Sequence, residues 1–368
     1  MHFLSAALLV LIAVLPPVSA KRPKTARLSR GAVWTSFKAL ELKNAQIESA
    51  KQALVGYRRV AVVAKPSVVA GDPNSASTAG IYALLLGQKL NYGANILPLD
   101  FVSTAQLFED SNSLEKAIET ARANHLDILV WCELQGAELT ITVVKIADLV
   151  TQQQLATVAI GDKLQSTIPA AREKLYAALG MNVPADQLQQ LPSQNLSALG
   201  KWMAAYSAAA QILRAEDEQA QKLLCEKVVK LSNEALAIDA GLVEAYLLKA
   251  SCLDELGDVG GVMQTLRDGF ARRDPKRIDP LTNFELQADY ERFTTKNIDK
   301  ALAGYLQILE VDPQNLRGAW GLIDILLEGD GKGKPQAEDI AEAANLATMI
   351  IAAHPQSAVA KVIADQVQ

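Results

Sequence analysis

The sequence predicts an α+β, multidomain protein in which a mixed α/β sheet domain is followed by an all-α helical solenoid. Three observations lead to this expectation. Between residues 57 and 180, short β-branched runs alternate with stretches of helical spacing. Beyond residue 195, apolar residues recur at helical spacing almost without a break. Half of the residues are hydrophobic and only 5% are aromatic, which suits helix-rich globular structure better than disorder or an all-β sandwich.

Residues 1–20 have the pattern of a signal peptide. The apolar run from Phe3 to Leu15 is too short to span a bilayer, and Val18–Ala20 offers a small-x-small cleavage site before Lys21. No cysteine follows the run, which argues against a lipoprotein. We therefore expect a periplasmic or secreted protein. An uncleaved membrane anchor is the alternative, because the leader lacks Lys and Arg and a basic segment follows it.

Residues 21–56 combine this basic segment with a predicted amphipathic helix. The helix is expected from Val33 to Gly56, where a glycine ends the periodic pattern. Its apolar stripe consists of Trp34, Phe37, Leu40, Ile47 and Leu54. We expect this stripe to cover the sheet, although it could instead bind a membrane surface or a partner helix.

The region 57–180 predicts a sheet flanked by helices. Strands are expected at RRVAVVAKP, ANILPLD, DILVWCELQG, ELTITVVKIAD and QQLATVAIGD, and a closing helix is expected from Leu164 to Leu179. In strand order and apolar spacing, most closely from Leu139 to Ala159, this region resembles the TolB amino-terminal domain and its CsgG-like and FlgO-like envelope relatives. The resemblance implies an envelope-type α/β domain and carries no catalytic signature.

A linker and a run of helices complete the chain. The linker is expected at 181–194, MNVPADQLQQLPSQ, because proline and glutamine replace apolar residues there. The region 195–368 is predicted to be helical throughout. Its helices are expected at 196–213, 218–237, 242–256, 261–272, 281–293, 298–311, 316–327, 337–353 and 358–367.

Within this helical region, one sequence pattern of helix end, turn and second helix occurs twice. Leu236 to Asp258 contains an apolar helix end, Asp239 as an N-cap candidate, a second apolar helix and a closing Gly-Asp, and Ile308 to Asp330 repeats this order. Asp279-Pro280 lies between them, 40 residues after Asp239 and 33 before the corresponding aspartate. A period near 34 residues is the tetratricopeptide (TPR) length. These segments resemble divergent TPR repeats, which are pairs of stacked antiparallel helices.

The TPR resemblance implies a partner-binding groove. Its positions are Glu244, Leu247, Ser251 and Asp254 in the unit that starts at Val243, and Arg317, Trp320, Asp324 and Leu327 in the unit that starts at Leu316. These residues mix charge with one large aromatic side chain, as peptide-binding surfaces do. The alternative is that Trp320 and Leu247 merely pack between helices. The implied partner is a protein or peptide.

Charge and motifs argue against several functional classes. A net charge of −5 and a pI near 5.4 argue against a nucleic-acid binder, which needs a basic face. The chain has no G-x-S-x-G or H-E-x-x-H motif, and EGDGKGKP at 328–335 fails the spacing of a phosphate-binding loop. We therefore expect no enzymatic activity, no catalytic residues and no cofactor.

Histidine and cysteine are scarce. Outside the leader only His125 and His354 occur, and neither has a second ligand at metal-binding spacing, so no metal site is expected. His354, which precedes a proline, is expected to be a solvated loop residue. Cys225 and Cys252 fall on neighbouring predicted helices, and a disulfide between them stays open.

These observations favour an exported, non-enzymatic protein-interaction or scaffold protein. Two alternatives stay open. One is a small-ligand sensor or hydrolytic enzyme with its site at the domain junction, because a site built from carboxylates leaves no motif. The other is a membrane-tethered envelope assembly factor that retains its leader and associates peripherally with lipid.

Overall fold

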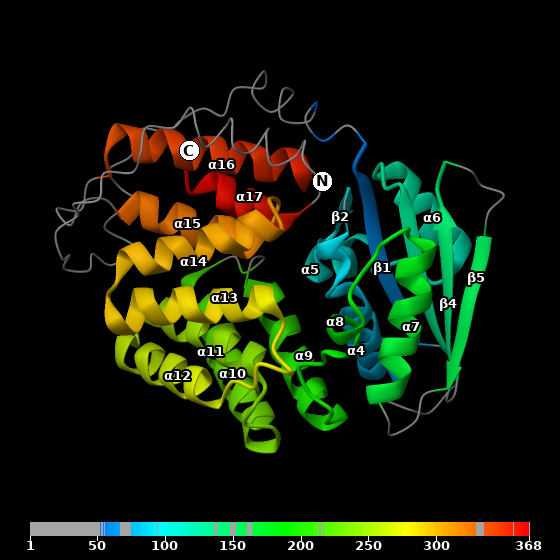
Figure 1. The fold of residues 1–368 in the computed structure, drawn as a ribbon, viewed down its shortest axis with the longest axis horizontal. Coiled ribbons are helices and arrows are strands. Elements are labelled where there is room, and N and C mark those ends of the chain that lie inside the picture. Colours follow the sequence, from blue (N-terminus) through cyan, green and yellow to red (C-terminus); the bar gives the residue numbers. More distant parts are fainter. Residues whose placement is uncertain are drawn as a thin grey trace.

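A computed structural model describes residues 52, 54, 56–66, 75–93, 95–135, 138–147, 152–159, 164–212, 215, 217–328, 335–355 and 357–367. The predicted signal peptide at 1–20 lies outside these residues, as does nearly all of 21–56. Figure 1 shows a part that carries a sheet beside a part built of helices. The expected α+β arrangement followed by helices is confirmed.

The sheet has five strands in the order β2-β1-β3-β4-β5. β1 (Arg58–Pro66) lies between β2 (Ile96–Pro98) and β3 (Ile128–Gln135), and these three strands are parallel. β4 (Glu138–Lys145) and β5 (Gln152–Ala159) extend the sheet as an antiparallel meander. Each of the five strands expected from the sequence is therefore present.

Helices cover both faces of this sheet, which explains why β1 and β3 read as continuous apolar runs. The flanking helices are α4 (Ser75–Gly87), α5 (Phe101–Leu107), α6 (Leu114–Ala123) and α7 (Leu164–Ala178). Val60 of β1 packs in the cluster of α4 and α7 on one face, whereas its neighbour Ala61 packs with α6 on the other. Ala61 in turn pairs in register with Leu129 of β3.

The helical part follows the short helix α8 (Ala185–Gln189). Its elements are α9 (Leu196–Ile212), α10 (Glu218–Ile238), α11 (Val243–Glu255), α12 (Val259–Arg272), α13 (Pro280–Asp289), the π-helical turn η2 (Tyr290–Thr295), α14 (Ile298–Val311), α15 (Leu316–Glu328), α16 (Ala337–Ala353) and α17 (Ala358–Asp365). Neighbouring helices are joined by short connections and lie side by side in Figure 1. Their ends fall within two residues of expectation, except that the helix expected at 281–293 is divided into α13 and η2.

Two helix junctions share one local geometry. Asp239 ends α10 with φ −135° and ψ 95°, and Asp312 ends α14 with φ −135° and ψ 89°. The prediction of Asp239 as an N-cap is wrong, because it is the C-cap residue of α10 and its carboxylate accepts hydrogen bonds from Arg277 and Ser193. The carboxylate also accepts from the Gly241 amide at 3.0 Å, and Leu242 is the N-cap residue of α11.

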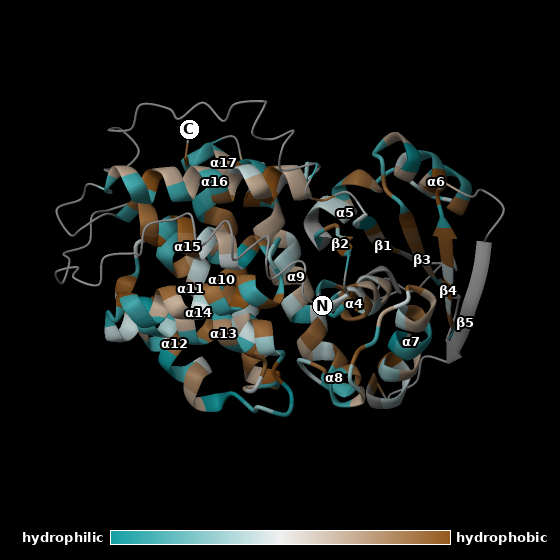
Figure 2. Cartoon of the chain, turned by 45° about the horizontal axis from the view of Figure 1, so that its top comes forward, coloured by the Kyte–Doolittle hydropathy of each residue, from teal (hydrophilic) through white to brown (hydrophobic). Residues whose placement is uncertain are grey.

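The main apolar cluster runs across the expected domain boundary. It includes sheet residues together with Trp202 and Met203 of α9 and Leu242 at the start of α11. The segment 181–194 forms α8 and buries Leu191 in the same cluster, so it packs instead of acting as a spacer. Figure 2 shows the hydrophobic residues along β1 and β3 and hydrophilic residues on parts of α6, α7 and α12. The sheet and the first helices of the array therefore share a core.

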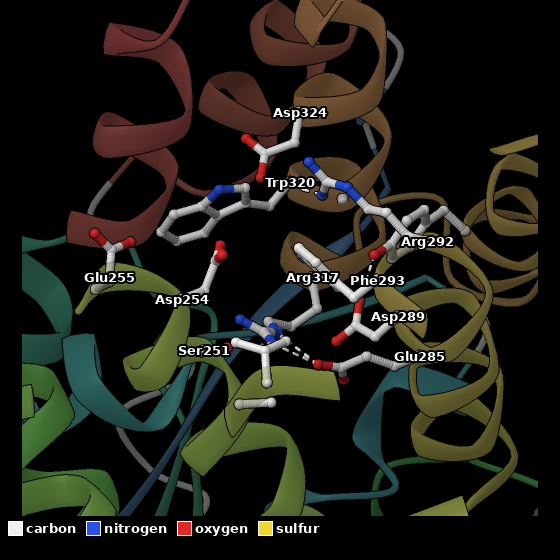
Figure 3. Close-up of a pocket in the computed structure, with 14 residues that line it drawn as sticks. Ser251, Asp254, Glu255, Glu285, Asp289, Arg292, Phe293, Arg317, Trp320 and Asp324 are labelled. Atoms are coloured by element: carbon white, nitrogen blue, oxygen red, sulfur yellow. Dashed lines mark hydrogen bonds and ion pairs between the residues drawn. The ribbon is translucent and has the colours of Figure 1, made fainter. Parts of the chain in front are cut away.

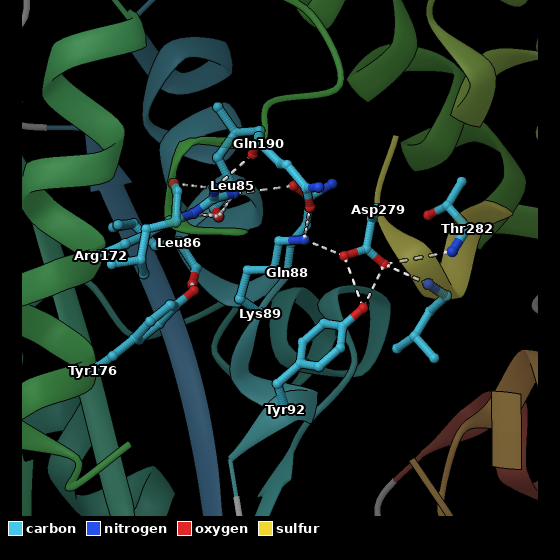
Figure 4. A network of polar contacts seen from close by, with 12 residues as sticks. Leu85, Leu86, Gln88, Lys89, Tyr92, Arg172, Tyr176, Gln190, Asp279 and Thr282 are labelled. Carbon is cyan, nitrogen blue, oxygen red and sulfur yellow. Dashed lines mark hydrogen bonds and ion pairs between the residues drawn. The ribbon is translucent and has the colours of Figure 1, made fainter. Parts of the chain in front are cut away.

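Arg172 of α7 is 0% exposed and is the largest fully buried side chain among the described residues. Its Nε and Nη2 donate to the carbonyl oxygen of Leu85 at 3.0 and 2.7 Å, and its Nη1 donates to the carbonyls of Leu188 and Gln190 at 3.0 and 2.7 Å. Burial lowers the pKa of Arg172. Backbone acceptors thus fix one guanidinium between α4, α7 and α8 (Figure 4).

A second buried cation joins the sheet part to the helical array. Lys89 is 1% exposed, forms an ion pair with Asp279 and donates to the Gln190 side chain at 2.9 Å. The Tyr92 hydroxyl donates to Asp279 at 3.0 Å, and Asp279 also caps α13 by accepting from the Leu281 amide at 3.0 Å. Burial lowers the pKa of Lys89, although Asp279 opposes this shift. This junction network, shown in Figure 4, anchors the start of α13.

Candidate functional site

A hollow of about 100 Å³ opens between alternate helices of the array, α11, α13 with η2, and α15 (Figure 3). We call it the groove. Its described lining residues are Ala250, Ser251, Asp254, Glu255, Val262, Glu285, Asp289, Arg292, Phe293, Tyr305, Arg317, Trp320, Gly321 and Asp324. Side chains from helices that are not consecutive in the chain therefore line one hollow.

Five of the eight predicted groove residues line this hollow, namely Ser251, Asp254, Arg317, Trp320 and Asp324. The structure places the other three elsewhere. Leu247 is buried in an apolar cluster between α11, α12 and α13, as the alternative interpretation expected. Leu327 is partly buried against the core of the last helices.

Glu244 lies in the first turn of α11, between the groove and the junction network. Its pKa is raised to about 7, chiefly by burial and also by the nearby carboxylates of Asp279 and Glu285. Asp279 belongs to the junction network and Glu285 to the groove. Glu244 therefore couples the two regions electrostatically and does not line the hollow itself.

Arg317 of α15 connects three helices across the groove. Its Nε and Nη2 donate to the Glu285 carboxylate of α13 at 2.8 and 2.5 Å, and Nη2 approaches the Ser251 hydroxyl of α11 at 3.4 Å. The side chain remains 46% exposed. Glu285 holds the pKa of Arg317 above its ordinary value, so the guanidinium is charged at any physiological pH.

Arg292 occupies the opposite wall and sits in the π-helical turn η2. Its Nη1 donates to Asp324 at 3.4 Å, and its Nη2 pairs with Glu328. Burial to 9% exposure disfavours the charge, but the two carboxylates outweigh burial and hold the pKa of Arg292 well above its usual value. No acceptor for Arg292 Nε occurs among the described residues. π-Helical turns of this kind are frequent at functional sites.

Asp289 and Tyr305 form the floor of the groove. The Tyr305 hydroxyl donates to the Asp289 carboxylate, and both residues are buried. Burial raises the pKa of Asp289 to about 6. A Cβ atom at Gly321 would overlap the Tyr305 ring, so only glycine lets α15 approach α14 this closely.

Trp320 lines the groove and is also partly buried against the core of the last helices. In Figure 3 its indole lies with Asp324 on one side and with Asp254 and Glu255 on the other. The described lining residues include five carboxylates and two guanidinium groups, so acidic groups are in excess. An aromatic face among carboxylates suits contact with a cation.

The groove predicted from the sequence does not include Glu285, Asp289 and Arg292, although the sequence contains a signal for them. The spacing i, i+3, i+7, i+10 that relates Glu244 to Asp254 gives these three residues when it is started at Thr282. Asp279 lies 40 residues after Asp239 and 33 before Asp312. Because these distances are unequal, the sequence pattern did not assign α13 to a repeat unit.

A second cavity of about 270 Å³ lies where the sheet meets the helical part. Leu97 and Asp100, at the end of β2, face the turns after α14 and α16 across it. Burial raises the pKa of Asp312 in its wall to about 6. Arg317 lines this cavity as well as the groove. The cavity lies beyond the carboxyl end of β2, a place where open α/β sheets commonly bind ligands.

The expectation for His354 is wrong. The side chain is 7% exposed, and its Nε2 lies 2.9 Å from the carbonyl oxygen of Gln314. His354 ends α16 and is covered by the turn between α14 and α15, so the proline after it does not imply a solvated loop. Burial lowers its pKa.

The remaining candidate groups form no site in the described part of the chain. Cys225 and Cys252 are buried in one apolar cluster, and both are free thiols. His125 is exposed after the end of α6. Among the described residues, no group of His, Cys, Asp and Glu could hold a metal ion, and no helix is both long and apolar enough to cross a bilayer.

Comparison with known proteins finds no match, either among protein-family models or among curated proteins.

Proposed function

We propose that this chain is a non-enzymatic protein-interaction or scaffold protein that binds a protein or peptide partner in the groove. The observation that carries the proposal is the convergence of α11, α13 and α15 on one hollow with an aromatic side chain and charged residues. Such surfaces suit hydrogen bonding and packing with a partner segment. Five residues chosen from the sequence for this role line the hollow, which adds to its support.

We interpret the helical part as a divergent TPR array. The shared geometry of Asp239 and Asp312, 73 residues apart, is consistent with two repeat units between them. In this interpretation α11, α13 and α15 are the first helices of successive pairs and face the partner. The TolB-like assignment of 57–180 belongs to the same proposal and rests on strand order and apolar spacing.

The size of the groove indicates how much of a partner enters it. A hollow of about 100 Å³ is well below the roughly 300–1,000 Å³ of pockets that enclose a drug-sized ligand. One side chain fits such a space, whereas a whole metabolite does not. The groove therefore suits an extended segment that inserts one side chain and places the rest along the helices.

Selection of peptides from a random library against the purified protein tests this function. We expect Trp320→Ala to lower the affinity of the protein for the selected peptides at least about 10-fold, as at an interface hot spot. Calorimetry measures this affinity. Leu223→Ala, at an exposed site of α10, is the matched control and should leave binding unchanged. Peptides that bind wild type and Trp320→Ala equally would show that the groove is not the site.

A small-ligand site at the junction is the second candidate function. The cavity of about 270 Å³ lies near the lower end of the range for ligand pockets and combines apolar walls with Asp100 and Asp312. A thermal-shift screen of metabolites would detect such a ligand. Leu97→Phe, which fills the cavity, should abolish the shift, and a shift that persists in this variant would place the ligand elsewhere.

Export and membrane association are proposals from the leader alone. Mass spectrometry of the mature amino terminus tests them. A chain that begins at Lys21 supports a periplasmic or secreted scaffold. An intact Met1 supports a tethered envelope assembly factor instead, with the basic segment at the lipid surface.

A further inference from the structure

We propose that Cys225 of α10 and Cys252 of α11 are oxidised to a disulfide when the chain folds in an oxidising compartment. The bond ties α11, whose Ser251 and Asp254 line the groove, to the helix before it in the chain. It concerns how the groove wall is held, and not what the groove binds.

The two thiols lie together in one apolar cluster. α10 and α11 are consecutive helices that pack side by side (Figure 1), and Cys225 and Cys252 are 2% and 3% exposed. They share the cluster with the small residues Ala205 and Ala208 of α9, and the two cysteine side chains are hydrogen-bonded to each other. A disulfide needs side chains that converge from neighbouring backbones, and this pair converges in that way.

Cys132 provides the contrast within the same chain. The sequence has three cysteines, and Cys132 lies in β3, in a cluster that contains neither of the other two. Since all three cysteines are described, Cys132 has no thiol beside it. Burial raises the pKa of Cys132 to about 12, so its thiolate is scarce. One isolated cysteine is thus distinct from one pair.

The hydrogen bond makes the two thiols of the pair unequal. Cys252 donates to the sulfur of Cys225 and so lowers the pKa of Cys225, although burial acts in the opposite direction. The same hydrogen bond, together with burial, raises the pKa of Cys252. Because the thiolate is the nucleophile in disulfide exchange, Cys225 reacts first and Cys252 second.

The oxidation requires a disulfide reagent, such as oxidised glutathione or a thiol-disulfide oxidoreductase of the compartment. The Cys225 thiolate attacks one sulfur of the reagent, whose disulfide breaks and releases a first reagent thiol after protonation. The sulfur of Cys252, having given up its proton, then displaces the second reagent thiol from Cys225. Two protein thiols are oxidised to one disulfide, the reagent disulfide is reduced to two thiols, and two protons pass from the protein to these thiols.

Burial determines when the bond forms. At 2% and 3% exposure the two sulfurs are out of reach of a reagent in the folded protein, so exchange takes place while α9, α10 and α11 are still open. The cysteines are 27 positions apart on helices joined by a short turn, so their contact is local in the sequence. Once α9 covers the pair, the same burial protects the bond from reduction.

Refolding of the full chain from guanidinium with oxidised glutathione tests the proposal. Alkylation in denaturant and tryptic mass mapping follow, and trypsin leaves each cysteine in its own peptide, 123–145, 223–227 or 250–267. We expect peptide 223–227 to be linked to 250–267 in most of the protein, and 123–145 to be recovered alkylated. Refolding with a reductant is the control and should give three alkylated peptides.

Variants locate the bond. Cys132→Ala should leave the linked peptides unchanged, whereas Cys225→Ala and Cys252→Ala should each abolish them. Alanine fits the apolar cluster, and circular dichroism confirms that each variant is folded. Wild type should melt roughly 5 °C higher after oxidative than after reductive refolding, because the bond restricts the unfolded chain, and Cys225→Ala should show no such difference.

Several results would overturn the proposal without affecting the groove, whose test uses library peptides and Trp320→Ala. Three alkylated cysteines after oxidative refolding would show that the pair does not close. A glutathione adduct that stays on Cys225 would show that Cys252 cannot reach it. Links that involve Cys132 as often as the pair would show that the oxidation is unselective. Equal melting temperatures of the two wild-type forms would show that the bond does not hold α11.

Discussion

The groove and the junction hold arginine side chains in opposite ways. At the junction, backbone carbonyls surround the guanidinium of Arg172, which is 0% exposed. In the groove, side-chain carboxylates hold Arg317, which is 46% exposed beside an open hollow. Fixed backbone acceptors leave no freedom to exchange partners, whereas carboxylates can rearrange around a new cation. Burial against backbone therefore marks a structural role, and carboxylates around a hollow suit binding.

Replacement of Arg172 by methionine is the most severe test of this comparison. Methionine keeps the apolar stem but leaves the carbonyls of Leu85, Leu188 and Gln190 without their donors. Several unsatisfied buried acceptors should lower the free energy of unfolding by about 4 kcal/mol. Urea denaturation measures this loss. A loss below about 1 kcal/mol would mean that water replaces the guanidinium and that the buried Arg172 contributes little to stability.

Replacement of Lys89 by methionine should have the next largest effect. Asp279 would lose its cation but keep Tyr92 and the Leu281 amide as donors, so we expect a loss of about 2–3 kcal/mol. Lys89→Met with Asp279→Asn should recover part of this loss, because asparagine needs no counter-charge and still accepts at the helix cap. Urea denaturation of both variants checks it. Equal losses in the single and double variants would mean that the ion pair contributes little.

The pH dependence of stability should distinguish the groove floor from the junction. The folded state raises the pKa of Asp289 to about 6, above its unfolded value, so the ionised form is disfavoured on folding. Its contribution is therefore fully present below about pH 4 and is lost as the pH rises through 6. At pH 8 the Asp289→Asn variant should be more stable than wild type. The difference between their free energies of unfolding should be roughly 2 kcal/mol smaller at pH 4 than at pH 8.

Stability curves of wild type and Asp289→Asn between pH 4 and pH 8 measure this difference. Lys89→Met is the matched control from the junction, and its difference from wild type should stay nearly constant over the same range. A parallel offset of Asp289→Asn at every pH would contradict a raised pKa for this carboxyl group.

Local patterns allowed most of the fold to be predicted. The helix ends beyond residue 195 coincide with capping residues such as Asp217 and Asp258, which act on amides three positions away. The division of α13 from η2 was not predicted, because a change to π-helical hydrogen bonding leaves the apolar spacing nearly intact. The burial of Lys89 was also beyond local patterns, since its partner Asp279 lies 190 residues away.

The groove was predicted in part for the same reason. Spacing within one helix placed Ser251 and Asp254 correctly, and likewise Trp320. It could not show that Leu247, on the same helix, faces a neighbouring helix, because that depends on how the helices pack. The prediction for His354 was wrong for the same reason, because the residue that covers it, Gln314, lies 40 positions away in the sequence.

Arg317→Ala should have the smallest effect on stability and completes the comparison. Its ion pair with Glu285 is half exposed, so solvent screens it and its loss should lower the free energy of unfolding by at most about 1 kcal/mol. The matched junction variant Arg172→Ala removes the same atoms and should cost several times more. Urea denaturation at low and high salt checks both variants. If Arg317→Ala were as damaging as Arg172→Ala, the groove would be a structural joint between α11, α13 and α15, and its charges would not be available to a partner.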